Sequence, residues 1–352
     1  MSLCGNNHRA AKPRSHPDCK LGGAQRTQHT DQSPAALARQ VHLQSRKPDM
    51  SYRPATIGTE ARTLAQHLRL DELPSGVFGL SPAMGLAVVR LWYRYLTHID
   101  RNHEMTFMNY GYADTDPDAP LPALDREDEG NRYCIQLYQH LTTGVDLRGR
   151  DVLEIGCGRG GGASFVARYL KPASLTGIDI APRAIEFCNR HFGTAGLTFA
   201  RGDAEALDFG RDSFDAIINV ESSHYYRSMP RFLVEVRRVL KSDGWFLFAD
   251  FRKREEMPVL RRQLVEAGFE VVREANITDN ILRALEVDND RKLALIHKRV
   301  PWLFRKAFKE FAATPGSATY ESFSEARWEY SSFIMKRCGT ASPTQSKVEP
   351  PA

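Results

Sequence analysis

A run of glycines follows an apolar segment in the middle of the chain. Residues 151–162 read Asp-Val-Leu-Glu-Ile-Gly-Cys-Gly-Arg-Gly-Gly-Gly. Glycine permits the tight turns and close backbone approach that binding of a nucleotide-like ligand requires. Seventeen residues after this run, Asp179 ends a second apolar segment, where a carboxylate can accept hydrogen bonds from a ribose diol. Gly156, Gly158 and Gly161 also fit G-x-G-x-x-G, so this pattern alone leaves a nicotinamide oxidoreductase or a flavin protein open.

Two further acidic residues narrow the choice of ligand. Glu154 lies two residues before the first glycine, where its carboxylate would repel a pyrophosphate but suits a cationic or amino-bearing ligand. Asp203 follows a third apolar segment, where it can accept a hydrogen bond from an exocyclic adenine amine. The plain structural alternative for Asp179 and Asp203 is a helix N-cap, because Pro182 and Glu205 follow them closely.

A histidine follows the fourth apolar segment, within Asn219-Val-Glu-Ser-Ser-His. An unperturbed histidine titrates near pH 6.5, which suits removal of a proton from a hydroxyl group at neutral pH. We therefore expect His224 to act as a general base; the alternative is that it packs the loop or orients a substrate. Glu221 is expected to hold the imidazole in its productive tautomer or to contact the ligand, with a loop salt bridge as the alternative.

The segments around these residues alternate between strand and helix patterns. Strands are predicted at 152–155, 174–178, 197–200, 214–220, 245–249, 269–273 and 328–336, and helices at 131–143, 162–170, 182–192, 229–240 and 255–267. This alternation predicts parallel β-α-β units and a sheet covered by helices on both faces. The residues of interest then follow the carboxyl ends of strands, which is the edge where open α/β sheets bind ligands.

The order of these segments resembles the class I S-adenosylmethionine-dependent methyltransferases. The resemblance rests on the glycine loop, Asp179, Gly202-Asp203-Ala204, Asp212-Ser-Phe-Asp and Arg238-Val-Leu-Lys-Ser-Asp-Gly in sequence. Within that class, Glu154–Pro172, Asn219–His224 and Phe107-Met-Asn-Tyr-Gly-Tyr resemble the mycobacterial phthiotriol/phenolphthiotriol dimycocerosate methyltransferases, over about residues 85–338.

The resemblance implies a fold, a cofactor and a set of binding residues. The fold is α/β and Rossmann-like, with a mostly parallel seven-stranded sheet, helices on both faces and a helical cap. The cofactor is S-adenosyl-L-methionine, and the reaction is methylation of a hydroxyl on a lipid or polyketide-like molecule. Tyr110 would close over the methyl donor unless it only packs in the core, and Glu154 could hold loop amides instead of the ligand. The implied cofactor-binding residues are Glu154, Gly156, Gly158, Gly160, Asp179, Ile180, Asp203, Ala204, Asn219 and Tyr110.

Charge and composition divide the chain into parts. Residues 1–50 hold eight of the 48 Lys and Arg but three of the 43 Asp and Glu, so the rest of the chain balances at 40 of each. The first fifty residues have few aromatic or β-branched side chains, which predicts a disordered basic tail. We expect a helical cap and acidic loop over 51–130, a methyltransferase domain over 131–338 with a helical insertion at 276–322, and a second disordered tail over 339–352. The balanced body predicts no nucleic-acid partner.

The expected methyl acceptor is an apolar small molecule. A helix pattern over 84–96 and the insertion 276–322 supply apolar surface for it, unless these helices only pack on each other. The basic residues Lys298, Arg299, Arg305 and Lys306 form either a solvated face or a weak contact with an anionic membrane. The longest apolar stretch, 77–89, is interrupted by Pro82 and is too short to span a membrane. The oligomeric state is not indicated.

The six cysteines are scattered, without any C-x-x-C pair. This distribution argues against a disulfide framework and a zinc site, and it favours a reducing, cytoplasmic location without a metal. Two alternatives to the hydroxyl acceptor stay open within the methyltransferases: a fatty-acid carboxyl group and a sterol-type carbon. A protein that binds S-adenosylmethionine without catalysis is the alternative of another class.

Overall fold

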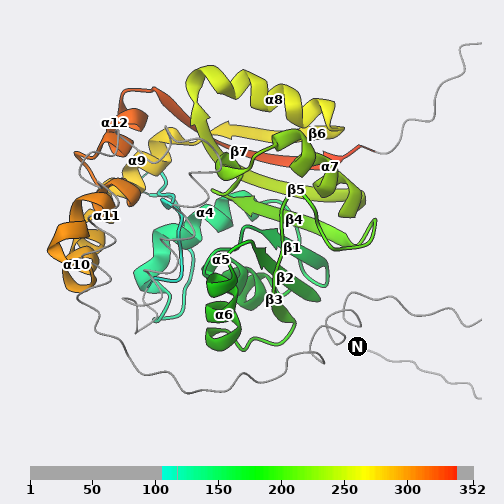
Figure 1. Cartoon of the computed structure of the whole chain (residues 1–352), viewed down its shortest axis with the longest axis horizontal. Coiled ribbons are helices and arrows are strands. Elements are labelled where there is room, and N and C mark those ends of the chain that lie inside the picture. Colours follow the sequence, from blue (N-terminus) through cyan, green and yellow to red (C-terminus); the bar gives the residue numbers. More distant parts are fainter. Residues whose placement is uncertain (1–104, 117, 339–352) are drawn as a thin grey trace, which may run out of the picture. The chain divides into compact units, whose positions relative to one another are not determined.

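The computed structural model describes residues 105–116 and 118–338 (Figure 1). The expected tails over 1–50 and 339–352 lie outside the described residues. The same holds for the helix expected over 84–96 and for most of the expected cap.

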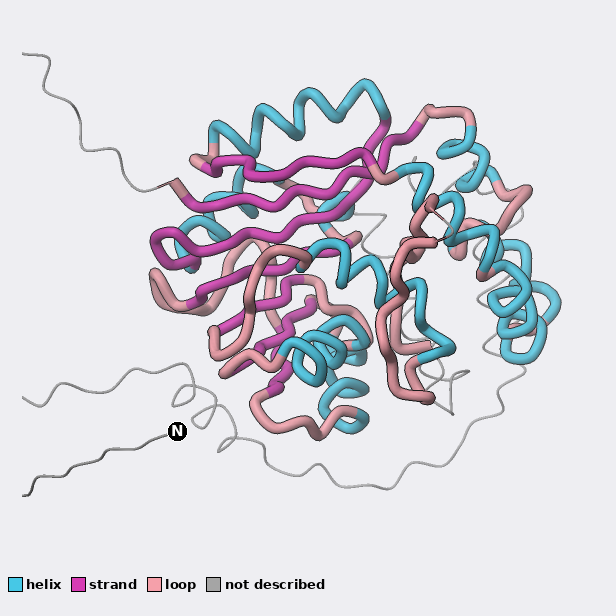
Figure 2. The backbone as a smooth tube through the Cα atoms, turned by 180° about the vertical axis from the view of Figure 1, so that it is seen from behind, coloured by secondary structure: helices cyan, strands magenta, loops and turns pink. Residues whose placement is uncertain are grey.

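Seven strands form one sheet, which confirms the expected architecture (Figures 1 and 2). The strand order is β3-β2-β1-β4-β5-β7-β6. Strands β1 to β5 are parallel, whereas β7 runs antiparallel to both β5 and β6. The strands are β1 Asp151–Ile155, β2 Ser174–Asp179, β3 Leu197–Arg201, β4 Phe214–Val220, β5 Leu240–Lys253, β6 Phe269–Asn276 and β7 Trp328–Arg337.

Helices cover both faces of this sheet, because side chains alternate along the central strands. In β5, Phe246 and Phe248 belong to one core cluster, and Leu247 and Ala249 belong to the other. One face is packed by α4 Arg132–Thr142, by α5 Gly161–Phe165 with the π-helical turn Val166–Leu170, and by α6 Pro182–His191. The opposite face is packed by α7 Met229–Val239 and α8 Met257–Glu266.

Strand β5 is longer than the sequence pattern predicts. It pairs with β7 from Trp245 to Lys253, beyond the point where β4 ends at Val220. Pairing with β7 therefore extends β5 beyond the apolar stretch from which this strand was predicted. As a consequence Asp250 is a strand residue at the carboxyl edge of the sheet, and α8 begins at Met257 instead of at residue 255.

The chain between β6 and β7 is helical. It forms α9 Thr278–Val287, α10 Asn289–Arg299, the 3-10 turn Trp302–Phe304, α11 Arg305–Phe311 and α12 Ala318–Ser324 (Figure 1). Ile281 and Leu285 of α9 and Phe323 of α12 join the core cluster on the α4 face. Ile296 and Phe308 form a separate small core with Val300. Among the described residues, no helix is long and apolar enough to cross a membrane.

Candidate active site

Asp179 holds the glycine loop in place at the carboxyl end of β2. Its Oδ2 accepts the N–H of Gly158 at 3.0 Å, and its Oδ1 accepts the N–H of Ala181 at 2.8 Å. Burial raises the pKa of this carboxyl, and the hydrogen bonds from backbone amides oppose that rise. The N-cap of α6 is Ala181, so the N-cap interpretation of Asp179 is wrong.

Two glycines of the loop are required for different reasons. A Cβ on Gly156, whose φ is +74°, would lie 2.4 Å from Ser222 Oγ in the loop after β4. A Cβ on Gly160 would lie 2.9 Å from Cys188 Sγ and from the Phe199 ring. Gly156 therefore joins the glycine loop to the β4 loop, whereas Gly160 allows close packing against α6 and β3.

Two buried oxygen atoms beside this loop have no hydrogen-bond partner among the described residues. The Glu154 side chain is 1% exposed; its Oε1 accepts the Tyr138 hydroxyl at 2.6 Å, and its Oε2 is unpartnered. Asn219 donates from Nδ2 to Ile155 O at 2.8 Å, and its Oδ1 is likewise unpartnered. Burial, assisted by the charge of Asp179, raises the pKa of Glu154 to about 8. A buried acceptor without a partner, such as Asn219 Oδ1, suits an N–H donor.

A first cavity opens at the carboxyl edge of β1, β2 and β3. Seven of the site residues expected from the sequence line this cavity: Gly156, Gly158, Asp179, Ile180, Asp203, Ala204 and Glu221. Residues 106–109, Tyr138, Tyr225 and Arg227 also belong to the described wall. Gly160, Glu154, Asn219, Tyr110 and His224 do not line this cavity.

Asp203 lies in a turn at the wall of the first cavity. Its Oδ1 accepts the N–H of Glu205 at 2.9 Å, and its Oδ2 is 3.7 Å from Arg227 Nη2. No helix begins directly after Asp203, so its N-cap interpretation is wrong.

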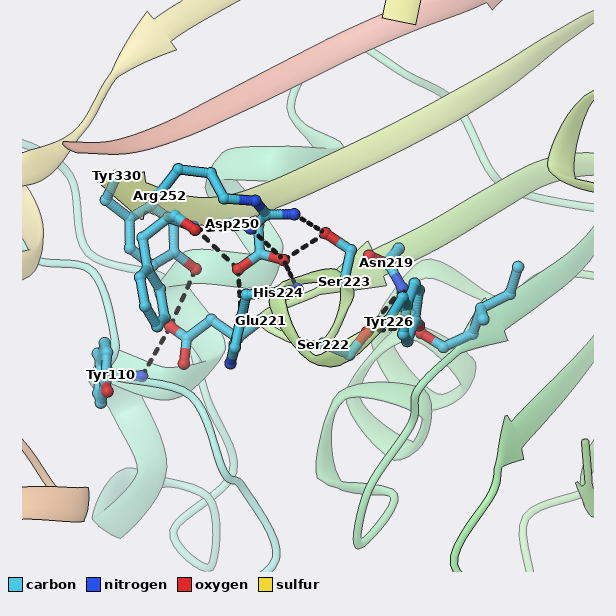
Figure 3. Close-up of polar contacts among 12 residues, drawn as sticks. Tyr110, Asn219, Glu221, Ser222, Ser223, His224, Tyr226, Asp250, Arg252 and Tyr330 are labelled. Atoms are coloured by element: carbon cyan, nitrogen blue, oxygen red, sulfur yellow. Dashed lines mark hydrogen bonds and ion pairs between the residues drawn. The ribbon is translucent and has the colours of Figure 1, made fainter. Parts of the chain in front are cut away.

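His224 belongs to a buried polar cluster at the ends of β4 and β5 (Figure 3). His224 Nδ1 is 2.7 Å from Asp250 Oδ1, and Ser223 Oγ donates to Asp250 Oδ2 at 2.5 Å. Arg252 Nη1 is 3.2 Å from Asp250 Oδ2. Burial opposes ionisation of Asp250, yet His224 and Arg252 hold its pKa well below the usual range. An ionised carboxylate can only accept, so Nδ1 carries the proton and Nε2 is the basic nitrogen.

Sequence reasoning missed Asp250, which takes the orienting position at Nδ1 that Glu221 was expected to fill. The signal in the sequence was a single acid within an otherwise apolar run. The structure buries this acid completely, at 0% exposure. Glu221 Oε1 instead accepts the N–H of Tyr110 and the Tyr330 hydroxyl, both at 2.9 Å. Burial, with the charge of Asp250, raises the pKa of Glu221 to about 8.

The structure supports the alternative that Tyr110 packs in the core. Its side chain is 7% exposed, and its ring lies 5.7 Å from that of Phe251 and 5.8 Å from that of Phe323, centroid to centroid. Its backbone is fixed by Glu221 at the N–H and by Lys292 at the carbonyl, 3.2 Å away. The preceding residues 106–109 cover the first cavity instead.

A second cavity lies on the other side of residues 107–109, which line both cavities. Most of its wall is apolar and comes from residues 105–110, α10, α11 and the turns beside them. The apolar residues are Met105, Phe107, Met108, Leu295, Ile296, Val300, Phe308, Phe311 and Ala312. Arg291 and Lys292 are the cations in its described wall.

Comparison with known proteins agrees with this geometry. A family model described as a methyltransferase domain matches residues 153–248. A fatty-acid O-methyltransferase of Mycolicibacterium smegmatis is 40% identical over 241 residues, which cover 68% of this chain and 86% of that protein. A phthiotriol/phenolphthiotriol dimycocerosates methyltransferase of Mycobacterium tuberculosis is 40% identical over 230 residues, 65% of this chain and 84% of that protein.

Solved structures share the fold at lower identity. The [4+2]-cyclase SpnF has a TM-score of 0.54 and 21% identity, covering 71% of this chain and 95% of its own. A putative sarcosine dimethylglycine methyltransferase from Galdieria sulphuraria has a TM-score of 0.53 and 19% identity, covering 70% and 98%. At these identities the likeness concerns the fold alone.

Proposed function

This chain belongs to the S-adenosylmethionine-dependent methyltransferases, and we propose that it methylates a hydroxyl group of a lipid or polyketide-like small molecule. The main support for this proposal is that the first cavity, built from the glycine loop, adjoins the mostly apolar second cavity across residues 107–109. A methyl donor in the first cavity and an apolar acceptor in the second would meet at this shared wall. Positioning of two reactants is the main contribution that such an enzyme makes to the rate.

The first cavity fits the cofactor S-adenosyl-L-methionine. When bound, this cofactor supplies an electrophilic methyl group on a sulfonium sulfur. Asp179 and Asp203, which both line this cavity, would hold its ribose and adenine. Asp179 also keeps the loop amides in position before the ligand arrives.

His224 is the proposed general base. Because Asp250 accepts from Nδ1, Nε2 is the nitrogen that would take the proton of the acceptor hydroxyl. The imidazole packs against Tyr225, at 4.1 Å between centroids, and Tyr225 lines the first cavity. We therefore propose that Tyr225 turns aside when the acceptor binds, which would bring Nε2 to the shared wall.

The fatty-acid carboxyl group is the second candidate acceptor. One relative acts on it by name, and a buried lysine in the second cavity favours it. A carboxylate is already ionised, so its methylation needs no base and would not depend on His224.

His224→Ala tests the proposed base, with hexadecan-1-ol as the hydroxyl acceptor. We expect turnover to fall by about 100-fold while affinity for S-adenosylhomocysteine stays constant, since the imidazole is outside the donor-binding wall. Asp250→Asn should lower turnover in the same direction, because it removes the acceptor that sets the tautomer. His297→Ala, an exposed change on α10, is the matched control. Turnover of His224→Ala equal to that of His297→Ala would contradict the assignment.

We also propose a cytoplasmic location. The four described cysteines, Cys134, Cys157, Cys188 and Cys338, are free thiols, which supports a reducing compartment. Weak peripheral contact with an anionic membrane stays a prediction, supported by Trp302, which is 78% exposed beside Arg305 and Lys306.

A further inference from the structure

Lys292 places a buried ammonium group in the wall of the second cavity. Its side chain is 11% exposed. Within the described part of the chain, Nζ donates to the carbonyl of Tyr110 at 3.2 Å and lies 3.9 Å from Asp288 Oδ2. The second distance is too long for a hydrogen bond. An ammonium has three N–H donors, so Lys292 keeps donor capacity for a ligand in the cavity that it lines.

Lys292 shares its nearest acid, Asp288, with a second cation. Asp288 is engaged by Arg291, which donates to both of its oxygens at 2.6 Å. Burial raises the pKa of the Cys134 thiol to about 11, so this neighbour is neutral. Burial also raises the pKa of Glu221 to about 8, so that carboxyl is mostly protonated at neutral pH. One positive charge therefore remains at this end of the cavity, and desolvation lowers the pKa of Lys292.

Apart from Asn109, Asn131 and Arg291, most residues that line the second cavity with Lys292 are apolar. Leu295, Ile296 and Val300 follow Lys292 along and just beyond α10, over a rise of about 12 Å. Phe308 and Phe311 of α11 add aromatic surface to this wall. Arg291 and Lys292 are the cations among its described lining residues. A cavity with one cationic end and a long apolar wall matches an amphipathic acid.

The cationic end of the second cavity is linked to the first cavity by hydrogen bonds. Tyr110 connects the two, because its carbonyl accepts from Lys292 while its N–H donates to Glu221. Glu221 lines the first cavity. A group bound at Lys292 therefore lies one backbone residue away from the donor-binding wall.

We propose that the second cavity binds a long-chain carboxylic acid with its carboxylate on Lys292, and that this carboxylate is a methyl acceptor, which rests on the methyltransferase function proposed above. One carboxylate oxygen forms the new O–C bond as the C–S bond of the donor breaks, and the electron pair of that bond stays on sulfur. The carboxylate becomes a neutral ester and the sulfonium a neutral thioether, so no proton is released. Lys292 acts here as a binding and positioning residue.

Binding of hexadecanoate and of hexadecan-1-ol tests the site without any turnover. We expect Lys292→Met to weaken hexadecanoate binding by about tenfold or more, since a charge-assisted hydrogen bond is lost. The affinity for hexadecan-1-ol should change by less than about threefold, because a neutral hydroxyl forms a weaker bond. Lys292→Arg should retain most of the discrimination. Lys306→Met, an exposed change on α11, is the matched control.

Lys292→Met keeps a side chain of similar length and should fold, although the Tyr110 carbonyl loses its donor. Unchanged affinity for S-adenosylhomocysteine would verify this. Equal loss of both ligands, or undiminished hexadecanoate binding, would overturn the carboxylate site. Lys292-dependent binding without any methyl hexadecanoate, in an enzyme that methylates hexadecan-1-ol, would overturn the acceptor step alone. Absence of product from both acceptors would instead overturn the proposed function.

Discussion

The first and second cavities are neighbours built in opposite ways. Most of the first is formed by loops that follow β1, β2 and β3 within about fifty consecutive residues, together with the β4 loop; residues 106–109 and Tyr138 add to its wall. The second joins residues 105–110 to α10 and α11, which follow about 180 or more positions later in the chain. A site made from successive β-α units leaves a regular sequence signature. A site made by an insertion that packs against a distant segment leaves none.

The two cavities also differ in charge. Asp179 and Asp203 place acidic side chains in the wall of the first, whereas Arg291 and Lys292 line the second. Acidic groups suit a donor that carries a sulfonium and an amino group. Cationic groups suit an acceptor that offers an electron-rich oxygen. We therefore expect the two reactants to bind in different cavities, and variants in one cavity should spare the ligand of the other.

Asp179→Ala should have the largest effect on the first cavity. It leaves the buried N–H groups of Gly158 and Ala181 without their acceptor and removes the proposed ribose contact. We expect affinity for S-adenosylhomocysteine to fall by about 2 kcal/mol, or roughly 30-fold, in calorimetric titrations. Hexadecanoate binding should persist. Asp208→Ala, an exposed acid, is the control, and equal affinities of the two variants would break the assignment.

Gly156→Ala should have a smaller effect of the same kind. The added Cβ meets Ser222 Oγ, and φ is +74°, so the loop must shift. Donor affinity should fall about tenfold, and Ser222→Gly in the same chain should restore part of it by making room. Gly193→Ala is the control, since a Cβ there meets nothing within 4 Å. Full donor affinity in Gly156→Ala would show that the loop is not fixed by Ser222.

Glu154→Gln should change the pH dependence of stability, which is the smallest expected effect. The folded pKa of about 8 lies above the ordinary 4.5, so the folded chain holds an extra proton between these values. This contribution is complete below pH 4.5 and is lost as the pH rises to 8. Between about pH 5.5 and about pH 8 the midpoint of thermal unfolding should therefore drop by about 4 °C less in Glu154→Gln than in the unmodified chain. Glu255→Gln, an exposed change, should behave as the unmodified chain does. An identical drop in Glu154→Gln would mean that Glu154 is ionised in the folded state.

Much of the fold and of the first cavity could be predicted because local order determines them. Apolar runs identified the strands, and the glycine loop, Asp179 and Asp203 follow from their places after β1, β2 and β3. Asp250 could not be found, because β5 reaches it only through pairing with β7 about 80 residues later. Lys292 is one of several basic residues on α10, and only its packing against Tyr110 distinguishes it.

Transfer of a labelled methyl group tests the central claim most directly. The full chain, incubated with S-adenosylmethionine that carries a ¹³C methyl group, is supplied with hexadecan-1-ol or with hexadecanoate, and products are analysed by mass spectrometry. The two-cavity account predicts a labelled methyl group on oxygen, as the ether from the alcohol or as the ester from the acid. Bound donor with no labelled product, or a label found on carbon, would contradict it.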